Sequence, residues 1–160
     1  MNELWLTAAT LACAIGSALV AGMFYAFSTF IMNALRRLPT AGGIAAMQQI
    51  NITVITPWFM GAFFGTAVLC LVLGAAALLD WKGTTSILLL SGSGLYLIGT
   101  IAVTIAFNVP RNDALAAVEA GDAAATNLWS TYLSEWTIWN HVRTAAAIAA
   151  TLSLLGAFAI

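Results

Sequence analysis

Four long apolar stretches divide the chain, and the short segments between them hold most of its charged residues. The stretches cover about residues 4–33, 51–79, 84–108 and 135–160. Each is long enough to supply the roughly 20 residues with which an α-helix crosses about 30 Å of hydrocarbon. Backbone groups in lipid must hydrogen-bond within the protein, and no segment alternates as barrel strands do. The pattern predicts one all-α domain over residues 1–160, an integral membrane four-helix bundle.

Composition supports the same class of protein. The chain is 62% hydrophobic and only 7% charged, whereas soluble domains carry roughly 25% charged residues. So few polar side chains cannot coat a water-soluble surface of this size. The net charge of -1 comes without a basic stripe, and this excludes nucleic acid as a partner.

Prolines are the expected breaks in the helical pattern. The segment 40–51 is expected to be a connector with room for one interfacial turn of helix. Pro57 either kinks the second helix and opens a cavity beside Asn51 and Trp58, or simply lies near the helix start. Pro110 is expected to end the third helix, because the residue before a proline avoids the α-helical region.

Polar residues are expected to converge at one end of the bundle. With four crossings, the connectors after the first and third helices lie on the same side. That side then holds Arg36, Arg37, Asn51, Asn108, Arg111, Asn112, Asn140, His141 and Arg143. About 17 residues follow Arg143 and span about 26 Å as a helix, so Arg143 lies just inside the membrane boundary. A charge there is costly unless it is paired or wet, and this predicts a ligand site.

The stretch 136–144 is the most polar and aromatic part of the fourth helix. Four of its side chains share one helical face: Trp136, Trp139, Asn140 and Arg143. His141, the single histidine, lies about 100° around the helix from Asn140.

Each of these residues also has a purely structural explanation. Asn51 and Asn108 would only hydrogen-bond between helices. His141 would be a satisfied interfacial residue, and Arg143 would extend to lipid headgroups. Tyr25 would belong to an interfacial aromatic belt instead of a pocket wall. Their coincidence at one depth favours the ligand site.

Four segments resemble the anthrone oxygenase-like family of small four-helix membrane proteins. The matching segments are residues 27–35, 46–51, 108–113 and 136–144. Asn-Val-Pro-Arg-Asn and Trp-Asn-His-Val-Arg are the most specific pieces. Fungal members of that family are linked to oxidation of anthrones to anthraquinones in polyketide pathways. The resemblance therefore implies a membrane oxidoreductase, a cofactor-independent monooxygenase that oxidises a flat aromatic substrate with dioxygen.

The implied chemistry assigns roles to the polar end of the bundle. An anthrone loses a proton, and its enolate reduces dioxygen without strict need of a metal. The expected catalytic residues are His141 as base, with donors for the enolate oxygen from Asn108, Asn140 and Arg143. The expected clamp for the ring is formed by Trp136, Trp139, Trp58 and Tyr25. Further expected binding residues are Asn51, Ser28, Arg111 and Asn112.

Two alternatives remain open at this point. One is a redox protein that binds haem or copper through His141, with Met32 or Met47 nearby. The other is a non-catalytic protein that binds a quinone or lipid or partners another subunit. The expected partners are a small aromatic or lipid-like molecule and membrane lipid, with a homo-oligomer as a further option.

The distribution of basic residues predicts the orientation. Lys and Arg gather on the side of the first and third connectors, and the positive-inside rule makes that side cytoplasmic. We expect the protein to reside in the bacterial inner membrane.

Overall fold

The computed structural model describes residues 3–160, and these form helices without any strand. Segments named η are π-helical turns within longer helices. In chain order the elements are α1 (Glu3–Ala26), η1 (Phe27–Ile31), α2 (Met32–Arg36), α3 (Thr40–Thr53), α4 (Pro57–Leu79), α5 (Thr84–Gly94), η2 (Leu95–Ala102), η3 (Thr104–Asn108), α6 (Val109–Ala116) and α7 (Ala123–Ala159).

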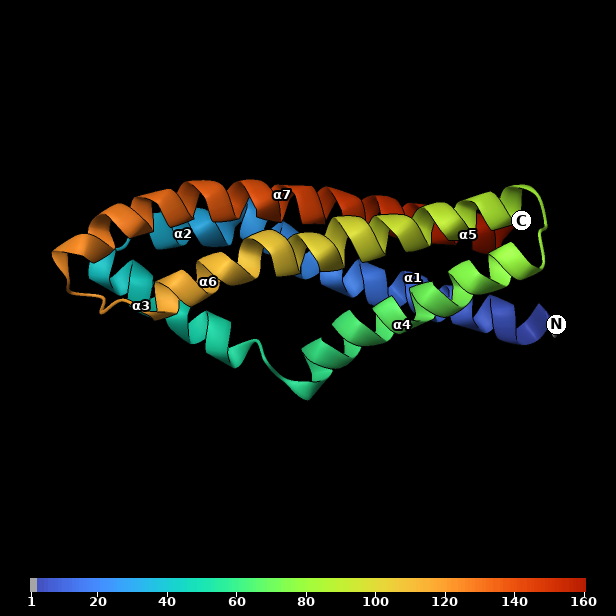
Figure 1. Cartoon of the computed structure of the whole chain (residues 1–160), viewed down its shortest axis with the longest axis horizontal. Coiled ribbons are helices and arrows are strands. Elements are labelled where there is room, and N and C mark those ends of the chain that lie inside the picture. Colours follow the sequence, from blue (N-terminus) through green and yellow to red (C-terminus); the bar gives the residue numbers. More distant parts are fainter. Residues whose placement is uncertain (1–2) are drawn as a thin grey trace.

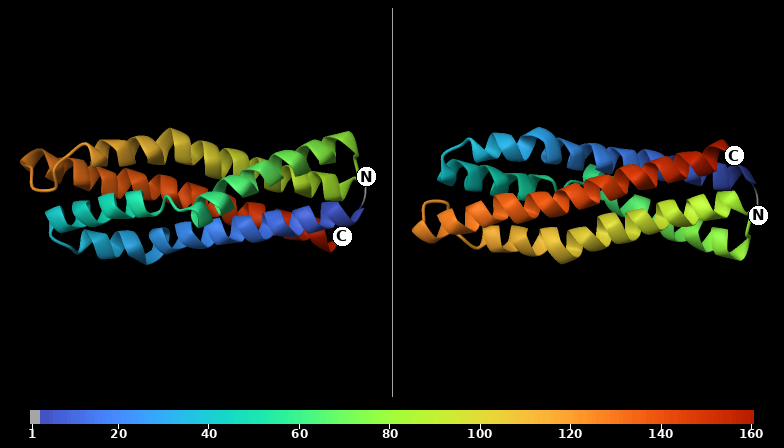
Figure 2. Two further views of the ribbon diagram at one scale, coloured as in Figure 1. Left: turned by 90° about the horizontal axis from the view of Figure 1, so that it is seen from below. Right: turned by 90° about the horizontal axis from the view of Figure 1, so that it is seen from above.

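These elements combine into four rods that lie side by side (Figures 1 and 2). The first rod is α1–η1–α2, the second is α3 with α4, the third runs from α5 to α6, and the fourth is α7. Both termini lie at the end of the bundle where α4 turns into α5, and α3 and α6 lie at the other end. Four helices are long and apolar enough to cross a membrane: Leu4–Arg36, Pro57–Leu79, Thr84–Ala116 and Ala125–Ala159. The all-α membrane four-helix bundle is thereby confirmed.

The rods are longer than a membrane is thick. Helix α7 has 37 residues, which span about 55 Å against about 30 Å of hydrocarbon. Aromatic side chains indicate where the hydrocarbon ends, because Trp and Tyr favour the interface. Trp58 and Trp81 lie exposed at opposite ends of α4, and Trp5 and Tyr25 are separated by about 30 Å along α1.

The bundle therefore has a membrane half and a crown. The membrane half extends from the termini to the level of Trp58 and Tyr25. The crown consists of α2, α3, α6 and the first half of α7. Each half has its own apolar core. Buried residues of the membrane core include Val20, Phe63, Leu73, Tyr96 and Leu154. Those of the crown core include Ile44, Met47, Leu115, Trp129 and Tyr132.

The second rod differs from the sequence prediction. Residues 40–53 form helix α3 instead of a connector, and the membrane helix begins at Pro57, not at Asn51. Pro57 lacks an N–H group and holds Thr56 in an extended conformation, with φ −109° and ψ 151°. The Thr56 hydroxyl then caps α4 by accepting a hydrogen bond from the Phe59 amide at 3.2 Å. Pro57 therefore lies at the start of a helix, which is one of the two alternatives predicted from the sequence.

The other three rods extend beyond their predicted ends. The first continues to Arg36 instead of residue 33, and α7 begins at residue 123 instead of 135. The third was expected to stop before Pro110, yet it continues to Ala116. The π-helical turns η2 and η3 precede this proline, and Arg111 Nη1 donates to the Phe107 carbonyl at 2.7 Å. The wider π-helical turns thus accommodate a proline that would break a regular α-helix.

We expect Gly99→Ala to destabilise the contact between the third rod and α7. A Cβ atom at Gly99 would overlap the Ala146 side chain, which has no rotamer to move into. The loss should be about 1–3 kcal/mol in free energy of unfolding, measured by denaturation in detergent. Gly94→Ala on the same rod is the control, because open space surrounds that position. Equal stability of the two variants would contradict this packing.

Candidate functional site

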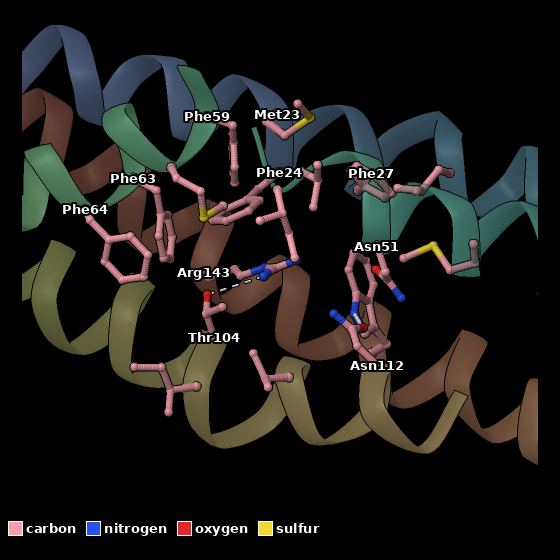
Figure 3. A pocket seen from close by; sticks show the side chains of 18 residues that line it. Met23, Phe24, Phe27, Asn51, Phe59, Phe63, Phe64, Thr104, Asn112 and Arg143 are labelled. Atoms are coloured by element: carbon pink, nitrogen blue, oxygen red, sulfur yellow. Dashed lines mark hydrogen bonds between the residues drawn. The ribbon is translucent and has the colours of Figure 1, made fainter. Parts of the chain in front are cut away.

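A cavity of about 250 Å³ lies where the membrane core meets the crown core. Figure 3 shows side chains from several rods pointing into it. Its volume is just below the range for small-molecule sites, roughly 300–1,000 Å³. Most of its wall is apolar, with the aromatic residues Phe24, Phe27, Phe59, Phe63, Phe64 and Trp136. Four polar or charged side chains also line it: Asn51, Thr104, Asn112 and Arg143.

The break between α3 and α4 shapes this cavity. Residues 54–56 are not helical, and the two helices meet there at an angle away from the other rods (Figure 1). Val54 and Ile55 of the break line the cavity. Irregular backbone at membrane depth is tolerated where it lines a cavity or is buried in protein. Pro57 therefore positions the site by ending α-helical hydrogen bonding at this level.

The cavity opens through an apolar rim. Ile55 is 69% exposed and Ile105 is 59% exposed, although both line the cavity. Phe64 and Val109 are also exposed lining residues. An exposed apolar rim at this level is suited to contact lipid.

Arg143 is the charged group of the cavity. It is only 5% exposed. Its Nε donates to Asn140 Oδ1 at 3.0 Å, and Nη1 donates to Thr104 Oγ1 at 3.3 Å. Its guanidinium carbon lies 3.9 Å from the ring centroid of Phe24 and 4.8 Å from that of Trp136. These are cation–π contacts.

No carboxylate of the described residues forms an ion pair with Arg143. Ion pairs in that part of the chain include Lys82 with Asp80 and Arg111 with Glu135. An arginine stays protonated in proteins. A buried cation held only by neutral groups therefore gives the cavity a positive potential, which favours a ligand with a negatively charged oxygen.

Asn140 holds Arg143 in place. This fully buried amide donates from Nδ2 to the Phe24 carbonyl at 2.8 Å and to Ser28 Oγ at 2.7 Å. Ser28 Oγ also lies 3.0 Å from Thr144 Oγ1. Asn140 and Ser28 thus support the guanidinium from the side away from the cavity and do not line the cavity, whereas the sequence analysis expected both to contact the ligand.

Asn108 is also a supporting residue. It is fully buried, and its Nδ2 donates to the Trp136 carbonyl at 3.2 Å. Its Oδ1 is buried without a partner among the described residues. Asn108 does not line the cavity and joins the third rod to α7, as its structural explanation held.

Several predicted site residues lie outside the cavity. Trp58 is 89% exposed and Tyr25 is 56% exposed, as expected of an interfacial belt. Trp139 stacks on Phe107, with ring centroids 3.5 Å apart. Arg111 forms an ion pair with Glu135, in which Arg111 Nη2 and Glu135 Oε2 are 2.6 Å apart.

His141, the expected base, lies away from the cavity. It is exposed and lies in a shallow groove outside α1 and α7, next to Tyr25 and Thr29. Residues two positions apart on an α-helix are about 200° apart, so His141 and Arg143 face opposite directions. The structure therefore does not place His141, the expected base, next to Arg143, the expected anion-binding group.

Sequence reasoning missed Thr104 and Phe24, because they lie inside apolar stretches with no motif. It also missed Phe27, although this residue begins the matching segment 27–35. It also missed Tyr132, whose hydroxyl donates to Asn112 Oδ1 at 2.9 Å. Thr104 offered one signal, as a polar residue at the depth of Arg143.

The described residues do not assemble a ligand set for a metal. No three His, Cys, Asp or Glu side chains converge in that part of the chain. Met47 lines the cavity, but His141 lies in the outer groove, so the two do not meet. The haem or copper alternative stays a prediction.

We expect Asn140→Leu to lower the free energy of unfolding by about 2–4 kcal/mol, because it leaves the Phe24 carbonyl, Ser28 and Arg143 without their partner. Chemical denaturation in detergent measures this loss. Asn127→Leu is the control, because Asn127 is exposed on the same helix. If both variants are as stable as the wild type, Asn140 does not support the site.

Comparison with known families adds one finding. The family described as anthrone oxygenase matches residues 58–153, which is more than half of the chain. The matched region includes Thr104, Asn112, Trp136 and Arg143. No curated protein and no solved structure matches the chain.

Proposed function

We propose, because the chain belongs to the anthrone oxygenase family, that its cavity binds a flat polyketide-like aromatic compound and oxidises it with dioxygen. The observation that carries the proposal is the buried Arg143 at an apolar, aromatic cavity. A cation in such a site stabilises an enolate more than it would in water. The aromatic wall suits a flat ring system.

The proposed reaction converts a ring methylene into a carbonyl group. The methylene loses a proton, and the electron pair moves onto the carbonyl oxygen to give an enolate. Dioxygen takes up electrons from this enolate, a C–O bond forms at the former methylene carbon, and protonation gives a hydroperoxide. Loss of the remaining C–H proton together with hydroxide breaks the O–O bond. One methylene and one dioxygen thus give one carbonyl and one water.

The described lining of the cavity includes no Asp, Glu or His. We therefore propose that the substrate proton passes to water at the membrane boundary and that Arg143 holds the resulting enolate. This assigns Arg143 the role of shifting the substrate toward its reactive anion. It leaves His141 outside the reaction.

We expect Arg143→Gln to lower kcat/KM for oxidation of 9-anthrone by about 100- to 1000-fold, the usual effect of losing an oxyanion donor. Arg143→Lys keeps the charge and should retain more activity. Oxygen uptake above the uncatalysed background measures the rate, and thermal unfolding in detergent confirms that the variants fold. If folded Arg143→Gln keeps full activity, the proposed function is wrong.

His141→Ala tests the other candidate for catalysis. Because His141 faces the outer groove, we expect this variant to oxidise 9-anthrone at the wild-type rate in the same oxygen-uptake assay. A loss of 100-fold or more in a folded variant would restore His141 as the base. Wild-type protein that binds 9-anthrone without any turnover would favour the non-catalytic binding function.

The pH dependence should follow the substrate. A guanidinium favours the anionic form, so it lowers the pKa of the bound substrate. The rate should rise with pH until the bound substrate is fully ionised. In Arg143→Lys this rise should stay near its wild-type position, and in Arg143→Gln it should move about one to three pH units higher. A profile unchanged in Arg143→Gln would contradict the role of Arg143.

We also propose the bacterial inner membrane as location, with the crown in the cytoplasm. Arg36, Arg37 and Arg111 lie in or next to the crown, whereas Lys82 lies at the opposite end. This bias supports a cytoplasmic crown by the positive-inside rule. A reporter enzyme fused after Ile160 that is active only outside the cytoplasm should then be active.

A further inference from the structure

Asn112 has a fixed orientation in the cavity wall. Its Oδ1 accepts hydrogen bonds from Trp136 Nε1 at 2.8 Å and from the Tyr132 hydroxyl at 2.9 Å. An indole N–H group can only donate. The amide atom that faces it must therefore be the oxygen, and Nδ2 is the end left for other contacts. This Nδ2 makes no hydrogen bond with the described residues.

The cavity thus presents donors at two separate levels. One is the guanidinium of Arg143 beside Thr104, and the other is Nδ2 of Asn112 beside Asn51 (Figure 3). Thr104 and Asn112 are eight residues apart on one rod, or about 12 Å along its axis. Trp136 spans the interval, because its ring lies 4.8 Å from the Arg143 guanidinium carbon and its Nε1 contacts Asn112. A flat ligand against this indole meets both donors.

The proposed reaction places oxygen at two positions of the ring system. In an anthrone the reacting methylene lies across the central ring from the carbonyl carbon. When Arg143 binds the enolate oxygen, the oxygen taken from dioxygen appears on the far side of that ring. It is first part of a hydroperoxide and then the second carbonyl of the quinone. Both are hydrogen-bond acceptors.

We infer that Asn112 donates its Nδ2–H group to the oxygen that the reaction adds, so that the cavity recognises aromatic compounds with acceptor oxygens on opposite sides of the ring system. This inference rests on the proposed function for the reaction that supplies the second oxygen. Trp136 and Tyr132 are positioning residues for this contact, because both donate to the Asn112 oxygen and so orient its Nδ2 group. The Trp136 ring also lines the cavity.

Asn112→Asp tests this contact with little change of shape. The aspartate keeps an oxygen for Trp136 and Tyr132 and replaces the Nδ2 donor by an acceptor. Binding is measured without turnover, as quenching of tryptophan fluorescence in detergent under anaerobic conditions. The probes are 9,10-anthraquinone, which has two opposite oxygens, and 9-anthrone, which has one.

We expect wild-type protein to bind the quinone about three- to tenfold more tightly than the anthrone, the effect of one added hydrogen bond. Asn112→Asp should lose this preference, and Asn112→Ala should reduce it. Asn127→Asp, an exposed position on α7, should keep it. Denaturation in detergent shows whether each variant is folded.

The outcomes separate this inference from the proposed function. Wild-type protein that oxidises 9-anthrone but shows no quinone preference, or a preference that survives in folded Asn112→Asp, overturns the inference alone. A preference that depends on Asn112 without any turnover supports the contact and overturns the oxygenase function. Absence of both binding and turnover overturns both.

Discussion

The hydrogen bonds of Asn140 are the interaction on which the site depends. One buried amide joins α7 to the backbone of α1 at Phe24 and orients the guanidinium of Arg143. A charge at this depth is expensive unless neighbouring groups hold it. Thr104 and the faces of two aromatic rings supply the remaining contacts. The result is a cation that is supported by neutral groups and still available to a ligand.

A single break in the second rod shapes the cavity that Arg143 lines. Three rods pass this level as continuous helices, and only residues 54–56 leave helical geometry. Pro57 causes the break, and Thr56 caps the helix that follows. At this break α3 and α4 meet at an angle, and the membrane core and the crown core lie on either side of it. The cavity occupies the space between them and takes aromatic residues from both.

The sequence was sufficient for the membrane spans, because these follow from length and hydropathy. It was not sufficient for α3, since this helix has a composition of small and polar residues that is also common in connectors. The roles within 136–144 depended on which helical face meets the other rods. Periodicity correctly grouped Asn140 with Arg143 and separated His141, but it could not say which face lined the cavity. Phe24 and Tyr132 join the site only through tertiary packing.

The position of the apolar rim determines from which side of the bilayer a hydrophobic compound would reach the cavity. The rim lies at one boundary of the hydrocarbon, at the level of Trp58 and Tyr25, and not at its midplane. It is therefore open to a single monolayer of the bilayer. A hydrophobic compound dissolved in the opposite monolayer would have to flip across the bilayer before it could enter the cavity. The side of the membrane from which such a compound arrives would therefore govern its access to the cavity.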